Sequence, residues 1–303
     1  MTDRIMLLDT ASLYFRAFYG VPDKVKAADG SSVNAARGLL DMIAKLVTTY
    51  RPTRLVACWD DDWRPAWRVD LLPSYKAHRV VEAVPSGPDV EEVPDPLEAQ
   101  IPLIRETLAA LGIPVVGAAE HEADDVIGTL ATRADAPVDV VTGDRDLFQL
   151  IDDGRGIRVI YTARGMSNLE IVDDAAVVAK YGVHAAQYAD FAVLRGDPSD
   201  GLPGVAGIGE KSAAALLAAH GSLDAIRAAV RDGTAGTPAQ RTKITAAADY
   251  LEVAPTVVRV ARDLELAPFD DRLGFVDEDA ASALAEKWNL GSSMTRALAA
   301  LPH

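Results

Sequence analysis

Short apolar stretches rich in β-branched residues alternate with amphipathic stretches over the first half of the chain. The apolar stretches predict strands at residues 4–9, 54–60, 113–116, 138–142 and 157–162. Between them, the spacing of apolar residues predicts helices at residues 33–50, 97–111 and 122–133. Because strands that are separated by helices need crossover connections, we expect an α/β fold with a mainly parallel sheet flanked by helices.

The pattern changes after about residue 170, where alanine-rich helical stretches follow. The spacing of apolar residues there predicts helices at residues 211–220, 223–231 and 280–303. A late apolar run at residues 257–264 is strand-like. We therefore expect an α/β domain at residues 1–170 and a helical domain at residues 171–303.

Residues 61–100 interrupt the alternation of strands and helices and contain six prolines. A long insertion of this kind is usually either functional or disordered. Its first half combines aromatic and basic residues, which are the side chains that grip single-stranded nucleic acid: Trp63, Arg64, Trp67, Arg68, Tyr75, Lys76 and Arg79. The second half has acidic residues and no basic ones, so a solvated linker is an equally good interpretation there.

The composition sets limits on location and partners. A net charge of −15 over 303 residues argues against a polyanionic partner, unless acidic residues are concentrated where cations neutralise them. No run of about 18 apolar residues and no signal-peptide pattern is present, so we expect a soluble, cytoplasmic chain without a membrane partner. The single cysteine, Cys58, lies in an apolar run and suits a buried thiol in a reducing compartment.

Acidic residues follow several of the predicted strands. In a parallel sheet, the loops beyond the carboxyl ends of the strands form one edge where ligands bind. The segment HEADD, which opens a predicted helix, and the segment RGDPSDG add further acids near this edge. The candidates are Asp9, Asp60, Glu122, Asp124, Asp125, Asp144, Asp146, Asp197 and Asp200.

Carboxylates that gather in one place repel one another and raise each other's pKa values, and divalent cations remove this conflict. Oxygen ligands without a His or Cys cluster favour Mg²⁺ or Mn²⁺ over zinc. A pair of such ions is a common arrangement for hydrolysis at phosphorus. Any single aspartate here also has a simpler interpretation as a helix cap or turn residue, but so many at one edge favour a site for two or more ions.

A glycine-rich turn in LPGVAGIGEKSAAALLAAHG, residues 202–221, supplies a second signal. Gly204, Gly207 and Gly209 permit backbone conformations that other residues resist, and Lys211 opens the helix that follows. The free N–H groups of such a helix start can take a phosphate oxygen. We interpret the segment as a helix-hairpin-helix that holds a DNA backbone, with a plain structural turn as the alternative.

Five stretches carry a resemblance to a known family. They are, in order, LLDTASLYFRAFYG, WRPAWRVDLLPSYKAHR, HEADDVIGTLA, VVTGDRDLFQL and RGDPSDGLPGVAGIGEKSA. Together they resemble the bacterial 5′ nuclease family, which comprises flap endonucleases and the 5′→3′ exonuclease domain at the amino terminus of many bacterial repair polymerases. The resemblance extends from residue 4 to about residue 268. Because no polymerase portion follows in this sequence, we expect the stand-alone form.

The resemblance implies roles for matching positions. A first metal cluster would comprise Asp9, Asp60, Glu122 and Asp124, and a second Asp125, Asp144, Asp146, Asp197 and Asp200, with the partition between ions open. Lys76 and Arg79 match a catalytic basic pair that draws the scissile phosphate onto the metals. Tyr14 and Tyr75 match aromatic positions near the substrate strand. Two arginines of the insertion complete the expected DNA contacts: Arg64 and Arg68.

The resemblance also implies a PIN-like core, an arch formed by the insertion, and a helix-hairpin-helix at residues 202–220 that binds duplex DNA, with K⁺ as a further ligand of its turn. Two features depart from the family pattern. Gly201 stands where the family usually has asparagine, and the insertion is acidic after residue 81. The second departure leaves open whether the arch is closed or an open groove.

We expect a structure-selective, metal-dependent 5′ nuclease, acting as flap endonuclease and 5′→3′ exonuclease in replication and repair. Its substrates would be DNA with 5′ flaps, nicks or ends, recognised by shape and flexibility, and the chain would act as a monomer. RNA–DNA hybrids are left open as substrates. The alternatives are a metal-dependent ribonuclease of similar architecture, a non-catalytic junction-binding protein, and an acidic α/β protein of unrelated function.

Overall fold

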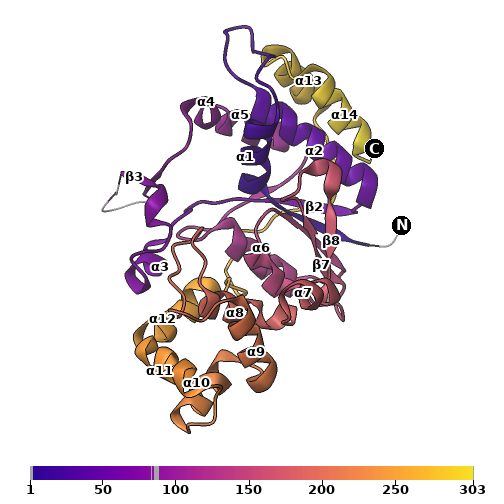
Figure 1. Cartoon of the computed structure of the whole chain (residues 1–303). Helices are drawn as coiled ribbons and strands as arrows, with labels where there is room; N and C mark the ends of the chain where they lie inside the picture. The colour runs from indigo at the N-terminus through magenta and orange to yellow at the C-terminus, as the bar shows by residue number, and fades with distance from the viewer. Residues whose placement is uncertain (1–2, 83, 85–88, 303) are drawn as a thin grey trace.

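A six-stranded sheet forms the centre of the first part of the chain in the computed structural model, which describes residues 3–82, 84 and 89–302 (Figure 1). Its strand order is β5-β2-β1-β6-β7-β8. The strands are β1 (Ile5–Asp9), β2 (Arg54–Cys58), β5 (Val115–Val116), β6 (Val138–Thr142), β7 (Ile157–Tyr161) and β8 (Glu170–Val172). Only β8 pairs in the antiparallel direction, so the predicted mainly parallel sheet is confirmed.

Both faces of the sheet are buried, because successive side chains of each strand point to opposite faces. In β1, Ile5 and Leu7 pack on one face while Met6 and Leu8 pack on the other. The second face is covered by α1 (Thr10–Gly20), α2 (Asn34–Tyr50), α5 (Ile101–Ala110), α13 (Glu278–Lys287) and α14 (Gly291–Ala300). The first face is covered by α6 (Ala123–Arg133) and by the helices within residues 174–258.

The helices within residues 174–258 form the lower part of the molecule in Figure 1. They are α7 (Asp174–Tyr181), α8 (Tyr188–Arg195), α9 (Glu210–His220), α10 (Leu223–Arg231), α11 (Pro238–Ala246) and α12 (Ala248–Val258). Short 3-10 helices occur at η2 (Asp146–Leu150), η3 (Met166–Asn168) and η4 (Ala185–Gln187). Phe191, Leu217 and Leu251 of these helices belong to the same hydrophobic cluster as Val126 and Ile127 of α6. The helical part therefore shares one continuous core with the sheet.

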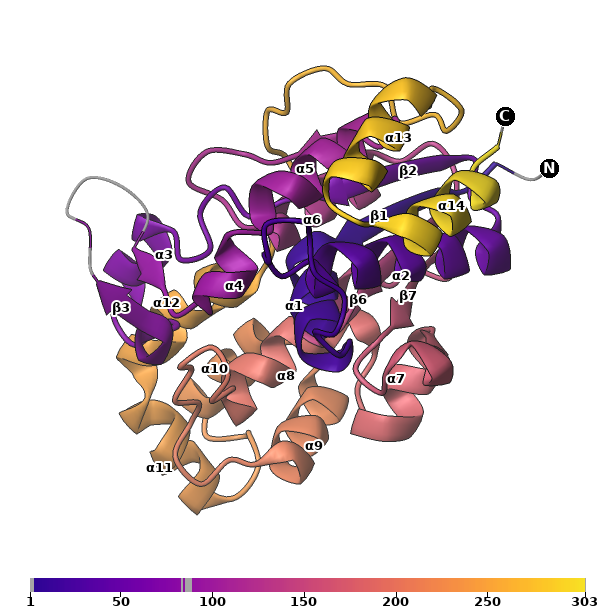
Figure 2. The same ribbon diagram turned by 90° about the horizontal axis from the view of Figure 1, so that it is seen from above.

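The last two helices return to the α/β part. Met294 and Ala297 of α14 are buried in the cluster that contains Leu40 and Ile43 of α2. In Figure 2, α13 and α14 lie beside α5 and α2, away from α9 to α11. The domain boundary expected near residue 170 stays a prediction. That prediction did not include the packing of α13 and α14 against α5 and α2 of the α/β part.

The strand expected at residues 257–264 is wrong. The helix α12 continues to Val258, and the chain beyond it is irregular. Its backbone groups bond to side chains where a strand would bond to a neighbouring strand: the N–H of Val260 donates to Gln149 Oε1 at 3.1 Å, and that of Ala261 to Asp125 Oδ1 at 2.8 Å. Buried backbone donors need a partner, and here polar side chains provide one. Apolar content alone could not distinguish this solution from a strand.

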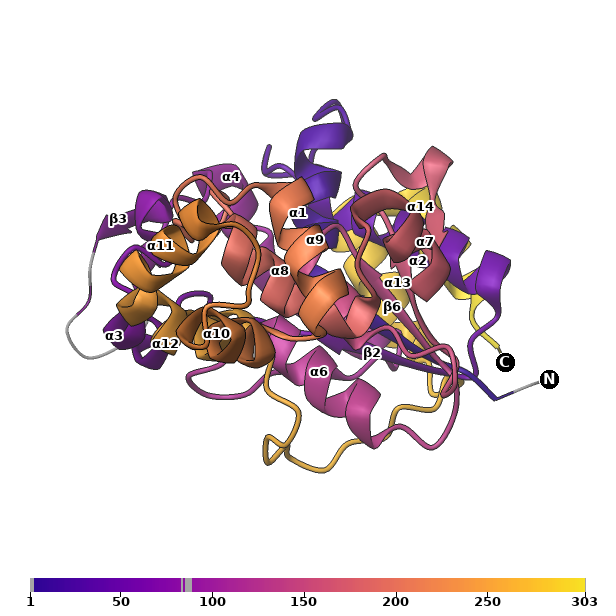
Figure 3. The ribbon, with the colours of Figure 1, turned by 60° about the horizontal axis from the view of Figure 1, so that its bottom comes forward.

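The insertion at residues 61–100 consists of short elements at one side of the molecule (Figures 1 and 3). They are α3 (Ala66–Leu71), η1 (Ala77–Arg79), an antiparallel hairpin of β3 (Val80–Glu82) and β4 (Val90–Glu91), and α4 (Asp95–Glu98). The helix expected at residues 97–111 is thus divided between α4 and α5. The α3 helix packs against α12, so the insertion contacts the helical part. Residues 83 and 85–88 of the predicted acidic linker lie outside the described residues.

Within the described part of the chain, no single helix has the length and hydropathy of a membrane span. The pair α9 and α10 passes that test jointly by length and composition, with a bend of 83° between the two helices.

Candidate active site

The carboxyl ends of β1 and β2 each deliver one aspartate to the same edge of the sheet. Asp9 is the last residue of β1 and caps α1, because its Oδ1 accepts a hydrogen bond from the N–H of Ser12 at 3.1 Å. Its Oδ2 accepts a hydrogen bond from the Thr142 hydroxyl at 2.6 Å. Asp60 follows β2, and its Oδ1 accepts from the N–H of Ala123 at the start of α6 at 2.8 Å. Local capping and sheet topology therefore set both carboxylates in place.

The end of β6 delivers the two aspartates of TGDRD. The N–H of Asp144 donates to the Thr142 hydroxyl, and Asp144 Oδ1 accepts from the N–H of Asp146, both at 2.8 Å. This turn leads into η2 and leaves Asp146 buried. Among the described residues, no hydrogen-bond donor contacts Asp146 Oδ1. A buried carboxylate oxygen without a donor is an unsatisfied acceptor that a cation could use.

A cavity of about 370 Å³ lies at this edge of the sheet. Seven of the residues that the sequence analysis singled out line it: Asp9, Asp60, Lys76, Arg79, Glu122, Asp124 and Asp144. Asp146 and Asp200 are buried close by, because each of them interacts electrostatically with Asp144. The structure thus brings together carboxylates that are up to 191 positions apart in sequence, from Asp9 to Asp200.

The carboxylates of the cavity are electrostatically frustrated. Burial raises the pKa of Asp9 to about 7, against the effect of the Thr142 hydrogen bond, and nearby Asp60 raises it further. Burial likewise raises the pKa of Asp60 to about 6. The pKa of Asp124 is raised well above its usual value by burial and then by Asp144. Such shifts mark a site where negative charge is costly without a cation.

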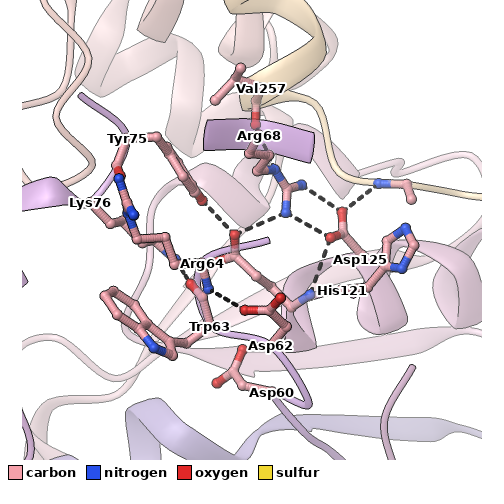
Figure 4. A network of polar contacts seen from close by, with 12 residues as sticks. Asp60, Asp62, Trp63, Arg64, Arg68, Tyr75, Lys76, His121, Asp125 and Val257 are labelled. Atoms are coloured by element: carbon pink, nitrogen blue, oxygen red, sulfur yellow. Dashed lines mark hydrogen bonds and ion pairs between the residues drawn. The ribbon is translucent and has the colours of Figure 1, made fainter. Parts of the chain in front are cut away.

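Asp125 is not among the residues that line the cavity, and its predicted role as a metal ligand stays a prediction. The guanidinium of Arg68 donates from Nη1 and Nη2 to its two carboxylate oxygens, both at 2.7 Å, and the N–H of Ala261 adds a third bond at 2.8 Å (Figure 4). The Asp125 side chain is fully buried, with no exposed surface. A carboxylate held in this way has a structural role, in joining α6 to the insertion and to the segment after α12.

Arg68 is likewise not available to DNA, although the sequence analysis placed it among the DNA contacts. Its side chain is 3% exposed, and it also donates to Glu122 Oε1 at 2.9 Å and, through Nε, to the carbonyl of Val257 at 3.0 Å. The two acids raise its pKa against the opposing effect of burial. Arg68 therefore links the insertion to α6 and α12 as an internal cation (Figure 4).

Glu122 and Lys76 form an ion pair at the wall of the cavity. Glu122 Oε1 accepts a hydrogen bond from the Tyr75 hydroxyl at 2.6 Å, and Lys76 Nζ also donates to the carbonyl of Trp63 at 3.2 Å. Lys76 has a φ of 46°, an uncommon backbone conformation for a residue other than glycine. Residues held in such conformations cluster at functional sites, which agrees with the position of Lys76.

The side chains of three further predicted DNA contacts are buried, and their roles stay predictions. Arg64 is buried, donating through Nε to the Tyr75 carbonyl at 2.6 Å and through Nη1 to Asp89. Tyr75 and Tyr14 are both buried, the latter beside Trp59 in the core. The aromatic side chain of α1 that lines the cavity is Phe15. Phe15 lies one helical turn after Ser12, which also lines the cavity, so the two side chains share one face of α1. The helical spacing could therefore have indicated Phe15 in place of Tyr14.

Asp197 and Asp200 lie on a tight turn after α8. Asp197 is held by Arg195 Nη2 at 2.9 Å, by Arg145 Nη2 at 3.4 Å and by Ser199, so its carboxylate is already balanced by positive charge. Asp200 interacts with Arg79 Nη2 at 3.4 Å. Burial raises the pKa of Asp200 to about 6, although Lys76 counteracts this effect. Two arginines therefore contact Asp197, whereas Asp200 keeps a raised pKa and would be stabilised by a further cation.

Several residues that line the cavity escaped the sequence analysis as functional candidates: Ser12, Phe15, Glu91, Arg145 and Ser199. Trp63, noted there only as part of the insertion, also lines it. Glu91 comes from the β4 hairpin, and burial raises its pKa although Arg79 and Lys76 oppose that shift. It lies in the acidic stretch that was interpreted as a linker, and no local pattern signals that the hairpin folds over the cavity.

The donor set fits hard divalent cations. Carboxylate oxygens dominate the wall of the cavity, and its burial makes them costly without a positive charge. Within the described ranges, no three acidic, histidine or cysteine side chains lie close enough to hold one ion as they stand.

The glycine-rich turn lies apart from the cavity, between α8 and α9. Val205 and Ile208 are buried and anchor it, whereas Gly207 and Gly209 are exposed. Gly207 has a φ of 76°, and its carbonyl accepts a hydrogen bond from Lys243 Nζ at 3.1 Å. The helix α9 begins at Glu210, one residue earlier than predicted, with Gly209 open to solvent at its start and Lys211 exposed in its first turn.

Two family descriptions match the chain along almost its whole length. Residues 4–182 match "5'-3' exonuclease, N-terminal resolvase-like domain", and residues 183–279 match "5'-3' exonuclease, C-terminal SAM fold". The chain is 61% identical over 299 residues to a 5′-3′ exonuclease of Streptomyces coelicolor, an alignment that covers 98% of this chain and 99% of that protein. The chain is a member of the 5′-3′ exonuclease family. The predicted family, its two-part fold and its 5′ nuclease reaction class are thereby confirmed.

More distant similarities agree with this family. The chain is 40% identical over 277 residues to the DNA polymerase I of Mycobacterium bovis, covering 88% of this chain and 29% of the polymerase. Among solved structures, the 5′-exonuclease of T5 with bound divalent metal ions (zinc) has a TM-score of 0.65 at 17% identity, and covers 98% of both chains. A complex of the T5 flap endonuclease with DNA and metal ions has a TM-score of 0.62 at 17% identity, with the same coverage. These two structures share the fold of the chain.

We predict that Arg68→Met strongly destabilises the protein. The substitution leaves Glu122 and Asp125 buried without their shared cation, and removing one partner of a buried ion pair costs about 3 to 5 kcal/mol. Urea unfolding followed by circular dichroism measures the loss.

Arg296→Met is the matched control, because the pair of Arg296 with Asp41 is about half exposed. It should cost less than about 1 kcal/mol. Equal losses in the two variants would show that the Arg68 pair is no more important for folding than a surface pair.

Proposed function

We propose that the protein is a divalent-metal-dependent, structure-selective 5′ nuclease that hydrolyses DNA phosphodiesters near junctions of single and double strands. The observation that carries this proposal is the cavity at the sheet edge. Its wall combines buried carboxylates with two cations, Lys76 and Arg79, from the insertion. Carboxylates alone would repel a phosphodiester, whereas carboxylates with bound cations and two basic side chains attract it.

The ions would be held by the carboxylates that line the cavity or are buried beside it: Asp9, Asp60, Glu122, Asp124, Asp144, Asp146 and Asp200. We propose Mg²⁺ or Mn²⁺, in two or more sites, because all of these ligands are hard oxygen donors. Bound divalent ions lower the pKa of an attacking water and stabilise charge on a leaving oxygen. The T5 structures that share the fold contain bound metal ions, zinc in one of them, which supports the binding of divalent ions in general.

Lys76 and Arg79 would orient the scissile phosphate. Lys76 is held by Glu122 and by the Trp63 carbonyl, so its ammonium stands in a defined position at the cavity wall. Arg79 is about one-third exposed and presents the guanidinium that can bind two phosphate oxygens. Phe15 and Trp63 offer aromatic faces beside them, which suits stacking with an unpaired base. These contacts are independent of base identity, as selection by DNA shape requires.

The glycine-rich turn would hold the duplex backbone at a distance from the cavity. Gly209 and the first turn of α9 offer free N–H groups to solvent, with Lys211 and Lys243 close to them. We propose that a phosphate of the duplex binds there and that carbonyl oxygens of the turn also bind K⁺. The arrangement reconciles a net charge of −15 with a DNA substrate, because the negative charge is gathered where cations bind. Action as a monomer in the cytoplasm belongs to the same proposal, and RNA–DNA hybrids stay open as substrates.

The first experiment is cleavage of a 5′-labelled flap duplex, compared with matched single-stranded DNA and RNA, in Mg²⁺, Mn²⁺ or EDTA. We expect metal-dependent cutting within about two nucleotides of the junction, because the duplex is gripped at a fixed place. Faster cutting of the single-stranded RNA would identify a ribonuclease instead. Binding of the flap without turnover in either metal would identify a junction-binding protein.

Divalent ions should stabilise the folded protein. Because Asp9, Asp60 and Asp124 are buried beside one another, a cation that binds them favours the native state, by about 2.7 kcal/mol at 100 times its dissociation constant. Thermal unfolding with increasing Mn²⁺ measures this gain, and EDTA should reverse it.

Asp144→Asn is the matched variant, since an asparagine oxygen can still accept the hydrogen bond from the N–H of Asp146. It should be more stable than the wild type in EDTA, because one repelling charge is removed, and it should gain less from Mn²⁺. A variant that gains as much as the wild type would remove Asp144 from the ion site.

Arg79→Ala should slow the chemical step more than it weakens binding. Loss of a preorganised cation at the reacting phosphate costs about 100-fold in rate. Single-turnover cleavage at saturating enzyme measures the rate, and fluorescence anisotropy of the flap DNA in Ca²⁺ measures the affinity.

Lys211→Ala provides the opposite pattern, because Lys211 lies on the exposed turn and away from the cavity. The affinity of this variant for duplex DNA should fall, and the slope of the logarithm of the binding constant against the logarithm of the salt concentration should decrease by about one. Its single-turnover rate should stay unchanged. A rate loss in Lys211→Ala equal to that in Arg79→Ala would contradict this division of roles.

A further inference from the structure

The turn that carries Asp197 and Asp200 is bonded to the insertion at three successive residues. The carbonyl of Ser199 accepts from Arg79 Nη2 at 2.8 Å, and the carbonyl of Asp200 accepts from the N–H of Lys76 at 3.0 Å. The carbonyl of Gly201 accepts from the Ser74 hydroxyl at 2.8 Å. Each donor comes from residues 74–79, the segment that contains both basic residues of the cavity. We call this set of bonds the 74–201 contact.

Glycine is required at position 201 by this contact. Gly201 has a φ of 71°, and a Cβ placed there would lie 2.0 Å from the carbonyl oxygen of Ser74 and 3.3 Å from the N–H nitrogen of Lys76. The obstructing atom belongs to the backbone, so no side-chain rotation can relieve the overlap. A residue with a Cβ, including the asparagine expected from the family pattern, would therefore force the two segments apart.

The same two segments are also joined by the ion pair of Arg79 Nη2 with Asp200 Oδ1, at 3.4 Å. The acidic turn is internally closed by Asp197 and Leu202, whose N–H groups each donate to the other's carbonyl, at 3.0 and 2.9 Å. The basic segment is held from its far side, where Lys76 pairs with Glu122. The 74–201 contact, together with the Arg79–Asp200 pair, therefore sets where Lys76 and Arg79 stand relative to Asp200.

We infer that Gly201 and Ser74 are positioning residues that set the register between the basic pair of the insertion and the acidic turn. This inference rests on the proposed function, since it assigns the contact a role in presenting the scissile phosphate to cations and carboxylates together. Rate depends steeply on such geometry, and a displacement of about 1 Å can cost 100-fold. Each of the two residues contacts backbone atoms of the other segment, so the role we assign to it is positioning and not catalysis.

The test compares Gly201→Ala with Gly233→Ala. Gly233 has a φ of 73°, almost that of Gly201, but a Cβ there would meet nothing within 4 Å. Both variants introduce the same backbone strain, of about 1 to 2 kcal/mol, and only the first separates the two segments. We expect the single-turnover rate on flap DNA to fall about 10- to 100-fold in Gly201→Ala and to stay at the wild-type level in Gly233→Ala.

A second pair of variants acts without steric overlap and covers the case in which Gly201→Ala does not fold. Ser74 is exposed, so Ser74→Thr has room for its methyl group and keeps the hydroxyl donor, whereas Ser74→Ala loses the bond to the Gly201 carbonyl. We expect a loss of a few-fold in rate for Ser74→Ala and a wild-type rate for Ser74→Thr, as befits one hydrogen bond of about 1 kcal/mol. If the contact were only structural, Ser74→Ala would lower the unfolding midpoint and would change the cleavage rate and the DNA affinity to the same extent.

We also measure the affinity for flap DNA in Ca²⁺ and the Mn²⁺ concentration that gives half of the maximal rate. Both values should stay within about threefold of the wild type, because an altered register displaces charged groups without removing them. Equal rates in Gly201→Ala and the wild type, or equal losses in Gly201→Ala and Gly233→Ala, would overturn the inference. So would a loss confined to DNA affinity. A wild-type protein that does not cleave flap DNA would instead refute the proposed function, so the two failures are distinguishable.

Discussion

Mutual repulsion among buried carboxylates is the constraint on which the rest of this site depends. Asp9, Asp60 and Asp124 lose solvent at one edge of the sheet, where each is also near another carboxylate. A folded chain can tolerate this arrangement if cations are supplied, either from its own side chains or from solution. The distribution of cations around the cavity therefore separates structural acids from acids that remain available to ions.

Internal cations serve some of these acids. Arg68 forms ion pairs with Asp125 and with one oxygen of Glu122, and Lys76 pairs with the other oxygen of Glu122. Arg195 pairs with Asp197. The remaining carboxylates, notably Asp124, Asp144 and Asp146, have no salt bridge among the described residues. An external divalent ion is the simplest source of the missing charge. The same division explains how residues of one acidic motif, HEADD, come to have different roles.

The insertion connects the two parts of the molecule at the site. Arg68 bonds to the end of α12, and residues 74–79 bond to the turn after α8. The cavity is thus closed by contacts between the insertion and the helical part, which also carries the turn proposed to grip the duplex.

The sequence by itself determined the parallel sheet, the acids at its edge and the glycine-rich turn, because strand periodicity and turn chemistry are local properties. Local pattern could not decide which side chains face the cavity. Asp124 and Asp125 are adjacent, yet one lines the cavity and the other bonds to Arg68. Glu91 and Phe15 reach it through a hairpin and a helix face that the sequence analysis did not assign to the site. Only tertiary structure decided these roles, because they depend on contacts between segments distant in sequence, whose partners no local period reveals.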